Sequence, residues 1–89
     1  MNNNSQWLLI EPNTCLQVSK LLEITLTRKN EDTGVIAFIG DVDSWEIGDY
    51  PWNIIQKIYN GILYRLNDCS GVIDVVGLVK SCMESEDET

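Results

Sequence analysis

Apolar residues in the first half of the chain recur in short runs or at every second position, which is typical of β-strands. Residues 7–10 form an apolar run that Pro12 ends, because proline cannot donate to a sheet ladder. Residues 35–39 form a continuous run rich in β-branched side chains, which predicts a strand covered on both faces. Apolar side chains at Leu22, Ile24 and Leu26 alternate with polar ones, which predicts a strand over residues 21–28. Three strands are therefore expected, with a polar hairpin connection at residues 29–34.

One helix is predicted from residue 51 to residue 66. Pro51 suits a helix start, where its missing N–H costs nothing. Gly61 weakens the helix by about 1 kcal/mol relative to alanine, but the apolar stripe continues past it. The stripe keeps spacings of three and four and consists of Trp52, Ile55, Ile58, Tyr59, Ile62, Leu63 and Leu66.

Two segments admit more than one interpretation. Before residue 21, Leu16 and Val18 continue the strand alternation, but Cys15 and Val18 also fit a helix capped by Asn13 or Thr14. Residues 72–79 fit either a helix capped by Ser70 or a strand favoured by β-branching. Both segments are too short for periodicity to decide.

The expected fold class is α+β: a small antiparallel sheet of about three strands with one main amphipathic helix packed on it. The C-terminal segment adds a further strand or a second helix. Residues 1–5 are expected to be a flexible N-terminus, and residues 6–82 a single domain. Residues 83–89 carry acidic side chains and no apolar residue after Met83, which predicts a disordered tail.

The charge of the chain limits its partners. Among 89 residues, 14 acidic ones oppose 6 basic ones and there is no histidine, so the net charge is −8. We expect no direct binding to nucleic acid or to an anionic membrane, because both need clustered Lys and Arg. No run approaches a membrane span and no signal peptide is recognisable. Cys15, Cys69 and Cys82 are typical of reduced thiols, with a Cys69–Cys82 bridge as the alternative, so a cytoplasmic location is expected.

Established motifs of metal and cofactor chemistry are missing from the sequence. A zinc site would lack histidine and paired cysteines. Asp41 and Asp43 begin like a calcium-binding EF-hand loop, but Trp45 and Glu46 occupy the positions of an oxygen ligand and of the required glycine. No glycine-rich phosphate loop occurs. The prediction is a protein without metal, cofactor or catalytic residues, and not an enzyme.

Residues 41–50 are predicted to form an acidic, aromatic loop that binds a partner. Between Asn30 and Gln56 there are six acidic residues and no basic one. Trp and Tyr bury much area at low entropic cost, which makes them typical of interface hot spots. Surrounding carboxylates would steer a basic partner. The candidate partner-binding residues are Asp41, Asp43, Trp45, Glu46, Asp49 and Tyr50. The structural interpretation is that the tryptophans belong to the core and that the acids favour the helix N-terminus.

Two functions fit these features. The first is a small acidic inhibitor or regulator that covers a basic surface of a protein partner, such as a nuclease or another nucleic-acid-processing enzyme. In composition alone the chain is similar to toxin-immunity proteins and to viral inhibitors encoded by phages, and no motif ties it to one family. The alternative is a structural or accessory assembly module, such as a homodimer, that buries residues 35–39 against a second copy.

Overall fold

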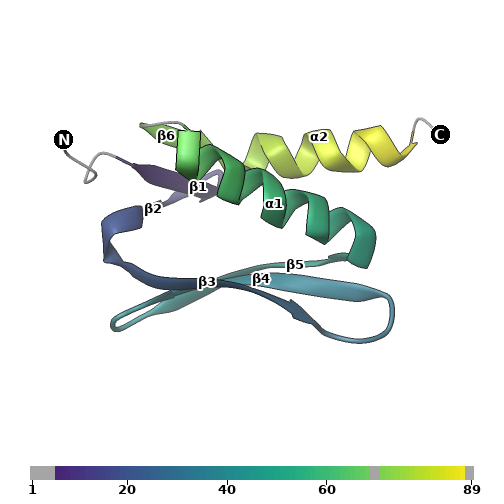
Figure 1. The fold of residues 1–89 in the computed structure, drawn as a ribbon, viewed down its shortest axis with the longest axis horizontal. Coiled ribbons are helices and arrows are strands. Elements are labelled where there is room, and N and C mark those ends of the chain that lie inside the picture. Colours follow the sequence, from purple (N-terminus) through teal and green to yellow (C-terminus); the bar gives the residue numbers. More distant parts are fainter. Residues whose placement is uncertain (1–5, 69–70, 88–89) are drawn as a thin grey trace.

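The computed structural model describes residues 6–68 and 71–87, and these residues form an α+β fold of two small sheets and two main helices (Figure 1). The predicted fold class is therefore confirmed. The elements in chain order are β1 (Trp7–Glu11), β2 (Thr14–Gln17), a short 3-10 helix η2 (Val18–Lys20), β3 (Leu21–Arg28), β4 (Thr33–Gly40), β5 (Ser44–Pro51), α1 (Trp52–Asp68), β6 (Val72–Asp74) and α2 (Val75–Asp87).

Strands β3, β4 and β5 form an antiparallel sheet, the meander, with α1 packed on one face. The face toward the helix carries matched apolar pairs across the strands, because partners in register point the same way. Phe38 of β4 lies between Ile24 and Trp45, and Ile36 lies between Leu26 and Ile47. Tyr59 of the helix donates its hydroxyl to Ile24 C=O of this sheet at 3.3 Å, and Ile55, Ile58 and Ile62 are fully buried in the same apolar core. The predicted helix is confirmed, and most of its stripe is buried or half-buried, but Leu63 is 41% exposed and Ile54, which the predicted stripe left out, is buried.

The second sheet has the strand order β2-β1-β6. Residues 7–10 were expected in the meander, and that prediction is wrong. Strand β1 instead pairs antiparallel with β2 and parallel with β6, which arrives late in the chain. The polar turn Pro12–Asn13 makes β1–β2 a hairpin of its own. Helix α1 lies between the meander and the layer of β1, β2, β6 and α2 (Figure 1), so one core joins both sheets.

The prediction of a loop at residues 41–50 is wrong for most of its length. Only residues 41–43 form a turn, and residues 44–51 form the strand β5. Trp45 and Ile47 keep the period of two that a strand requires, but the pattern breaks at Gly48, where the strand contains a bulge. That break and the surrounding acids concealed the strand in the sequence.

Two apolar positions differ from the pattern. Leu22 was expected on the buried face of its strand but is 70% exposed. Its strand bulges between Leu21 and Glu23, which inserts one residue without a partner and turns its side chain out. On β4, Ile39 is only half-buried, so residues 35–39 are not covered on both faces as expected.

The C-terminal segment contains both elements that the sequence left open. Val72–Asp74 is the strand β6, and α2 follows directly. The cap of α2 is Asp74, whose carboxylate accepts a hydrogen bond from Gly77 N–H at 2.9 Å. Residues 83–87 are helical where a disordered tail was expected, because extending a formed helix costs little.

Several predictions concern residues outside this description. The flexible N-terminus 1–5, the proposed cap Ser70 and residues 88–89 lie outside the described residues. Cys69, one half of the Cys69–Cys82 pairing, does too. Cys15 and Cys82 are free thiols. Residues 14–20, left open between helix and strand, form β2 and the short helix η2.

Candidate functional site

The six predicted partner-binding residues lie on the second hairpin of the meander. Asp41 and Asp43 are exposed in the turn between β4 and β5, which is closed by a 2.8 Å bond from Gly40 N–H to Asp43 C=O. The remaining four residues belong to β5: Trp45, Glu46, Asp49 and Tyr50. The structure brings these residues onto one rigid strand and its turn, and not onto a loop.

A bulge in β5 separates its aromatic residues from its acidic ones. Gly48 and Asp49 together oppose the single residue Val35 of β4. Without the extra residue, alternation from Ile47 would direct Asp49 toward the core. With it, Tyr50 takes the inward position and is half-buried, whereas Asp49 is exposed.

Glycine is required at position 48 for two reasons. Its φ of +148° lies in a region that L-residues rarely adopt. A Cβ at this position would also lie 2.6 Å from Val35 Cγ1. The glycine therefore allows the bulge, and the bulge orients the aromatic side of β5.

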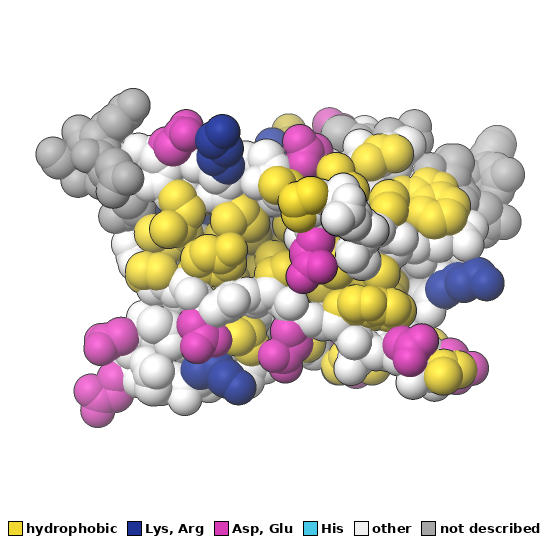
Figure 2. Space-filling model, turned by 180° about the vertical axis from the view of Figure 1, so that it is seen from behind, with side chains coloured by type: hydrophobic (Ala, Val, Ile, Leu, Met, Phe, Trp, Pro, Cys, Tyr) yellow, Lys and Arg dark blue, Asp and Glu magenta, His cyan; other side chains and the backbone are white. Residues whose placement is uncertain are grey.

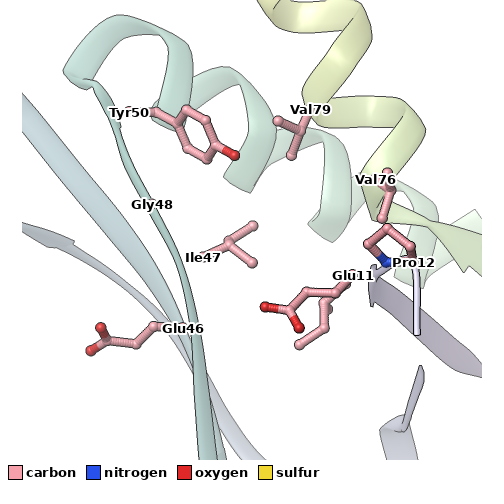
Figure 3. Close-up of a pocket in the computed structure, with 9 residues that line it drawn as sticks. Glu11, Pro12, Glu46, Ile47, Gly48, Tyr50, Val76 and Val79 are labelled. Atoms are coloured by element: carbon pink, nitrogen blue, oxygen red, sulfur yellow. The ribbon is translucent and has the colours of Figure 1, made fainter. Parts of the chain in front are cut away.

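Along its inner side, β5 borders a groove that we call the β5 seam, which contains two pockets. The smaller pocket, of about 250 Å³, is formed by β5, the β1–β2 hairpin and α2. Figure 3 shows Tyr50 and Ile47 pointing from β5 into it, and Glu11 facing them from the hairpin. Glu46 points to the other side of the strand. The remaining residues that line the smaller pocket are Ile10, Pro12, Gly48, Val76 and Val79.

The larger pocket of the seam, of about 710 Å³, lies at the turn end of β5. It is bordered by Trp45, by β2 and η2, and by the β4–β5 turn. Apolar side chains that are exposed gather here: Val42 is 87% exposed, Leu22 70% and Trp7 37%. Exposed apolar groups around a concave surface mark binding sites more often than a random surface does.

Carboxylates outnumber basic side chains along the seam. Glu11 is the acidic side chain that faces the smaller pocket, whose lining includes no basic residue, while the carboxylate of Glu46 lies on the outer side of β5. Asp41 and Asp43 border the larger one, where Lys20 is the single base. Figure 2 shows apolar side chains gathered across the middle of this side of the molecule, with carboxylates and basic side chains around them. The candidate site thus combines exposed apolar side chains with carboxylates.

Sequence analysis found part of this site and missed the rest. It identified the residues of β5 and its turn, which are continuous in the sequence, but assigned them to a loop. It did not identify Glu11, Trp7 or Leu22, because these residues reach the seam only through the second sheet and the β3 bulge. The exposure of Val42 could have been predicted from the sequence, because an apolar residue between two aspartates in a turn is not expected to be buried.

Comparisons with protein-family models, with curated proteins and with solved structures found no significant match. Within residues 6–68 and 71–87, no three His, Cys, Asp or Glu side chains are grouped as metal ligands. No described helix has the length and apolar character needed to cross a bilayer.

Proposed function

We propose that the protein is a small acidic inhibitor or regulator that binds a basic surface of a partner protein through the β5 seam. A nuclease or another nucleic-acid-processing enzyme has a surface of this kind, because it must bind phosphates. The observation that carries the proposal is the seam, where half-buried Trp45 and Tyr50 are surrounded by carboxylates on a rigid strand.

The chemistry of the seam supports binding by a basic protein. Aromatic side chains supply most of the affinity of an interface when they are held rigidly, and Trp45 and Tyr50 pack against the core. The carboxylates around them repel nucleic acid and attract Lys and Arg, which speeds association. A protein that competes with nucleic acid for a basic groove needs both properties.

The same features support a role outside catalysis and a cytoplasmic location. With no histidine in the chain, a nucleophile would need a carboxylate or lysine as its base. Cys15 is an exposed free thiol, which suits a reducing compartment. We therefore propose a cytoplasmic binding protein and not an enzyme.

The alternative of an assembly module has less support. It rested on residues 35–39, but these lie on the central strand of the meander. Ile36 and Phe38 are fully buried within one chain. The apolar surface that would have joined two copies is largely covered.

Capture from a lysate of the source cells, at low and moderate salt, tests the proposal with two matched variants. Asp41→Lys/Asp43→Lys reverses charge in the β4–β5 turn beside the larger pocket. Glu31→Lys/Asp32→Lys does so in the β3–β4 loop, at the other end of β4. Each reversal adds two positive units, so both variants change the net charge from −8 to −4.

The expected result is one basic protein held by the wild type and by the β3–β4 variant, released as salt rises, and lost by the β4–β5 variant. The captured protein should also be inhibited in its own activity by the wild type. Equal retention by both variants, or retention of no basic protein, would refute the proposal.

A further inference from the structure

Strand β5 is an edge of the meander. The strand order β3-β4-β5 gives it one neighbour, and within the described residues it pairs with β4 alone. An edge strand presents a row of backbone N–H and C=O groups that another chain can pair with. Proteins usually protect such an edge with lysine, proline or a bulge. Strand β5 has Pro51 as its last residue and a bulge at Gly48, but its first half, residues 44–47, contains no lysine, no proline and no bulge.

The seam extends beside this edge on the core side of the sheet. A strand added next to β5 would direct alternate side chains to that side, about 7 Å apart. There they would meet Ile47 and Tyr50 at the smaller pocket and Trp45 at the larger one. The remaining side chains would lie on the outer face beside Glu46, which points away from the pocket (Figure 3). The site therefore suits an alternating segment.

We infer that the β5 seam takes an extended segment of a protein partner, in which basic and apolar residues alternate, and that this segment adds to the meander as a fourth strand. Its apolar side chains enter the seam, and its Lys or Arg side chains lie opposite Glu46 and Asp49. Opposite charges directly across a strand pair stabilise the pair. This inference rests on the proposed function and specifies the kind of partner.

A second copy of the chain is a poor occupant of the same edge. In an antiparallel β5–β5 pair centred between Ile47 and Gly48, Glu46 of each copy would lie opposite Asp49 of the other. Like charges in that position destabilise the pair. Each copy would also bring a net charge of −8. In this register, the charges that oppose self-pairing are the ones that favour a basic strand.

The test is a titration of the full-length protein with blocked ten-residue peptides that alternate Lys with Val, Leu, Ile or Tyr. We expect at least one to bind in a salt-dependent way and to protect backbone amides of β5 from hydrogen exchange. Peptides of the same composition with all lysines at one end should bind more weakly. Alternating peptides in which Glu replaces Lys should not bind. If no alternating peptide binds, or if β5 amides stay unprotected, strand addition is wrong.

Backbone methylation distinguishes strand addition from simple side-chain binding. Successive N–H groups of a strand point to opposite edges, so methylating every second amide blocks one edge only. Of two versions of the binding peptide, methylated at all lysines or at all apolar residues, we expect one to lose binding and the other to keep it. Equal binding by both would overturn the inference.

A pair of charge variants locates the binding strand. Glu46→Lys should weaken the alternating peptide about five-fold, because it replaces a favourable cross-strand pair by a repulsive one. Glu23→Lys changes the net charge equally but lies on β3, the opposite edge, and should leave binding unchanged. Equal weakening by both would show attraction to net charge alone and would overturn strand addition.

The two proposals fail in different ways. If lysate capture identifies a basic partner but no alternating peptide binds, the inhibitor role stands and strand addition falls. If the peptides bind β5 but no basic partner is captured, strand addition stands and the inhibitor role falls.

Discussion

The indole ring of Trp52 lies against Gly34, so closely that a Cβ at position 34 would be 2.7 Å from its Cε3 atom. The guanidinium of Arg28 lies 4.2 Å from the centre of the same ring, in a cation–π contact. The backbone N–H of Trp52 donates to the backbone C=O of Asp32 at 2.7 Å. The first residue of α1 is thereby anchored to the β3–β4 hairpin. This anchor positions the end of β5, because Pro51 directly precedes the helix.

Gly34→Ala is expected to destabilise the protein by about 1–3 kcal/mol, since the added methyl group has no room and forces the ring or strand to shift. The free energy of unfolding in urea measures the effect. In a Trp52→Leu background the cost should be smaller, because the ring atoms are gone. An equal cost in both backgrounds would show that the backbone oxygen of Thr27, 3.0 Å from that Cβ position, causes the clash instead.

Gly48→Ala should cost about 2–4 kcal/mol, from the disfavoured φ together with the contact with Val35. Gly71→Ala is the matched control, because Gly71 also has a positive φ, of +86°, but a Cβ there meets nothing within 4 Å. It should cost only about 1 kcal/mol. Urea denaturation of both variants compares them. Equal costs would mean that φ alone, and not the fit against Val35, requires the glycine.

Periodicity was sufficient to predict the elements with an uninterrupted pattern. The helix stripe through Ile55, Ile58 and Ile62 and the alternation of Ile24 and Leu26 both correspond to buried faces. A bulge defeats such reasoning, because one unpaired residue reverses every side chain beyond it. The strand β5 was missed for this reason at Gly48.

Sheet partners were harder to predict than elements. The pairing of β1 with β6 joins residues far apart in the sequence, and no local pattern specifies it. The candidate site was therefore only partly predictable. Its β5 half is continuous in the sequence, whereas Glu11 and Trp7 reach the seam only through this pairing.

Asn30→Ala should destabilise the β3–β4 hairpin by about 1–2 kcal/mol. The Asn30 side-chain oxygen accepts hydrogen bonds from Asp32 N–H at 2.8 Å and Thr33 N–H at 2.9 Å, which closes the loop. Asn30→Asp keeps an acceptor at the same place and should retain most of the stability. Thermal unfolding monitored by circular dichroism measures both variants. If Asp loses as much as Ala, the oxygen is not the stabilising group.

Asp74→Ala should cost about 1 kcal/mol by removing the cap of α2. The carboxylate accepts from Gly77 N–H, and a glycine at position 77 leaves it room, since a Cβ there would lie 2.5 Å from Asp74 Oδ2. Asp74→Ser retains an acceptor and should lose less stability than Asp74→Ala.

Asp68→Ala is the matched control. Asp68 ends α1, where a negative charge opposes the helix dipole, so removing it should leave stability unchanged or raise it slightly. Urea denaturation followed by far-ultraviolet circular dichroism compares the three. Equal losses from Asp74→Ala and Asp68→Ala would show an effect of net charge, whereas a loss confined to position 74 assigns the stability of α2 to its cap.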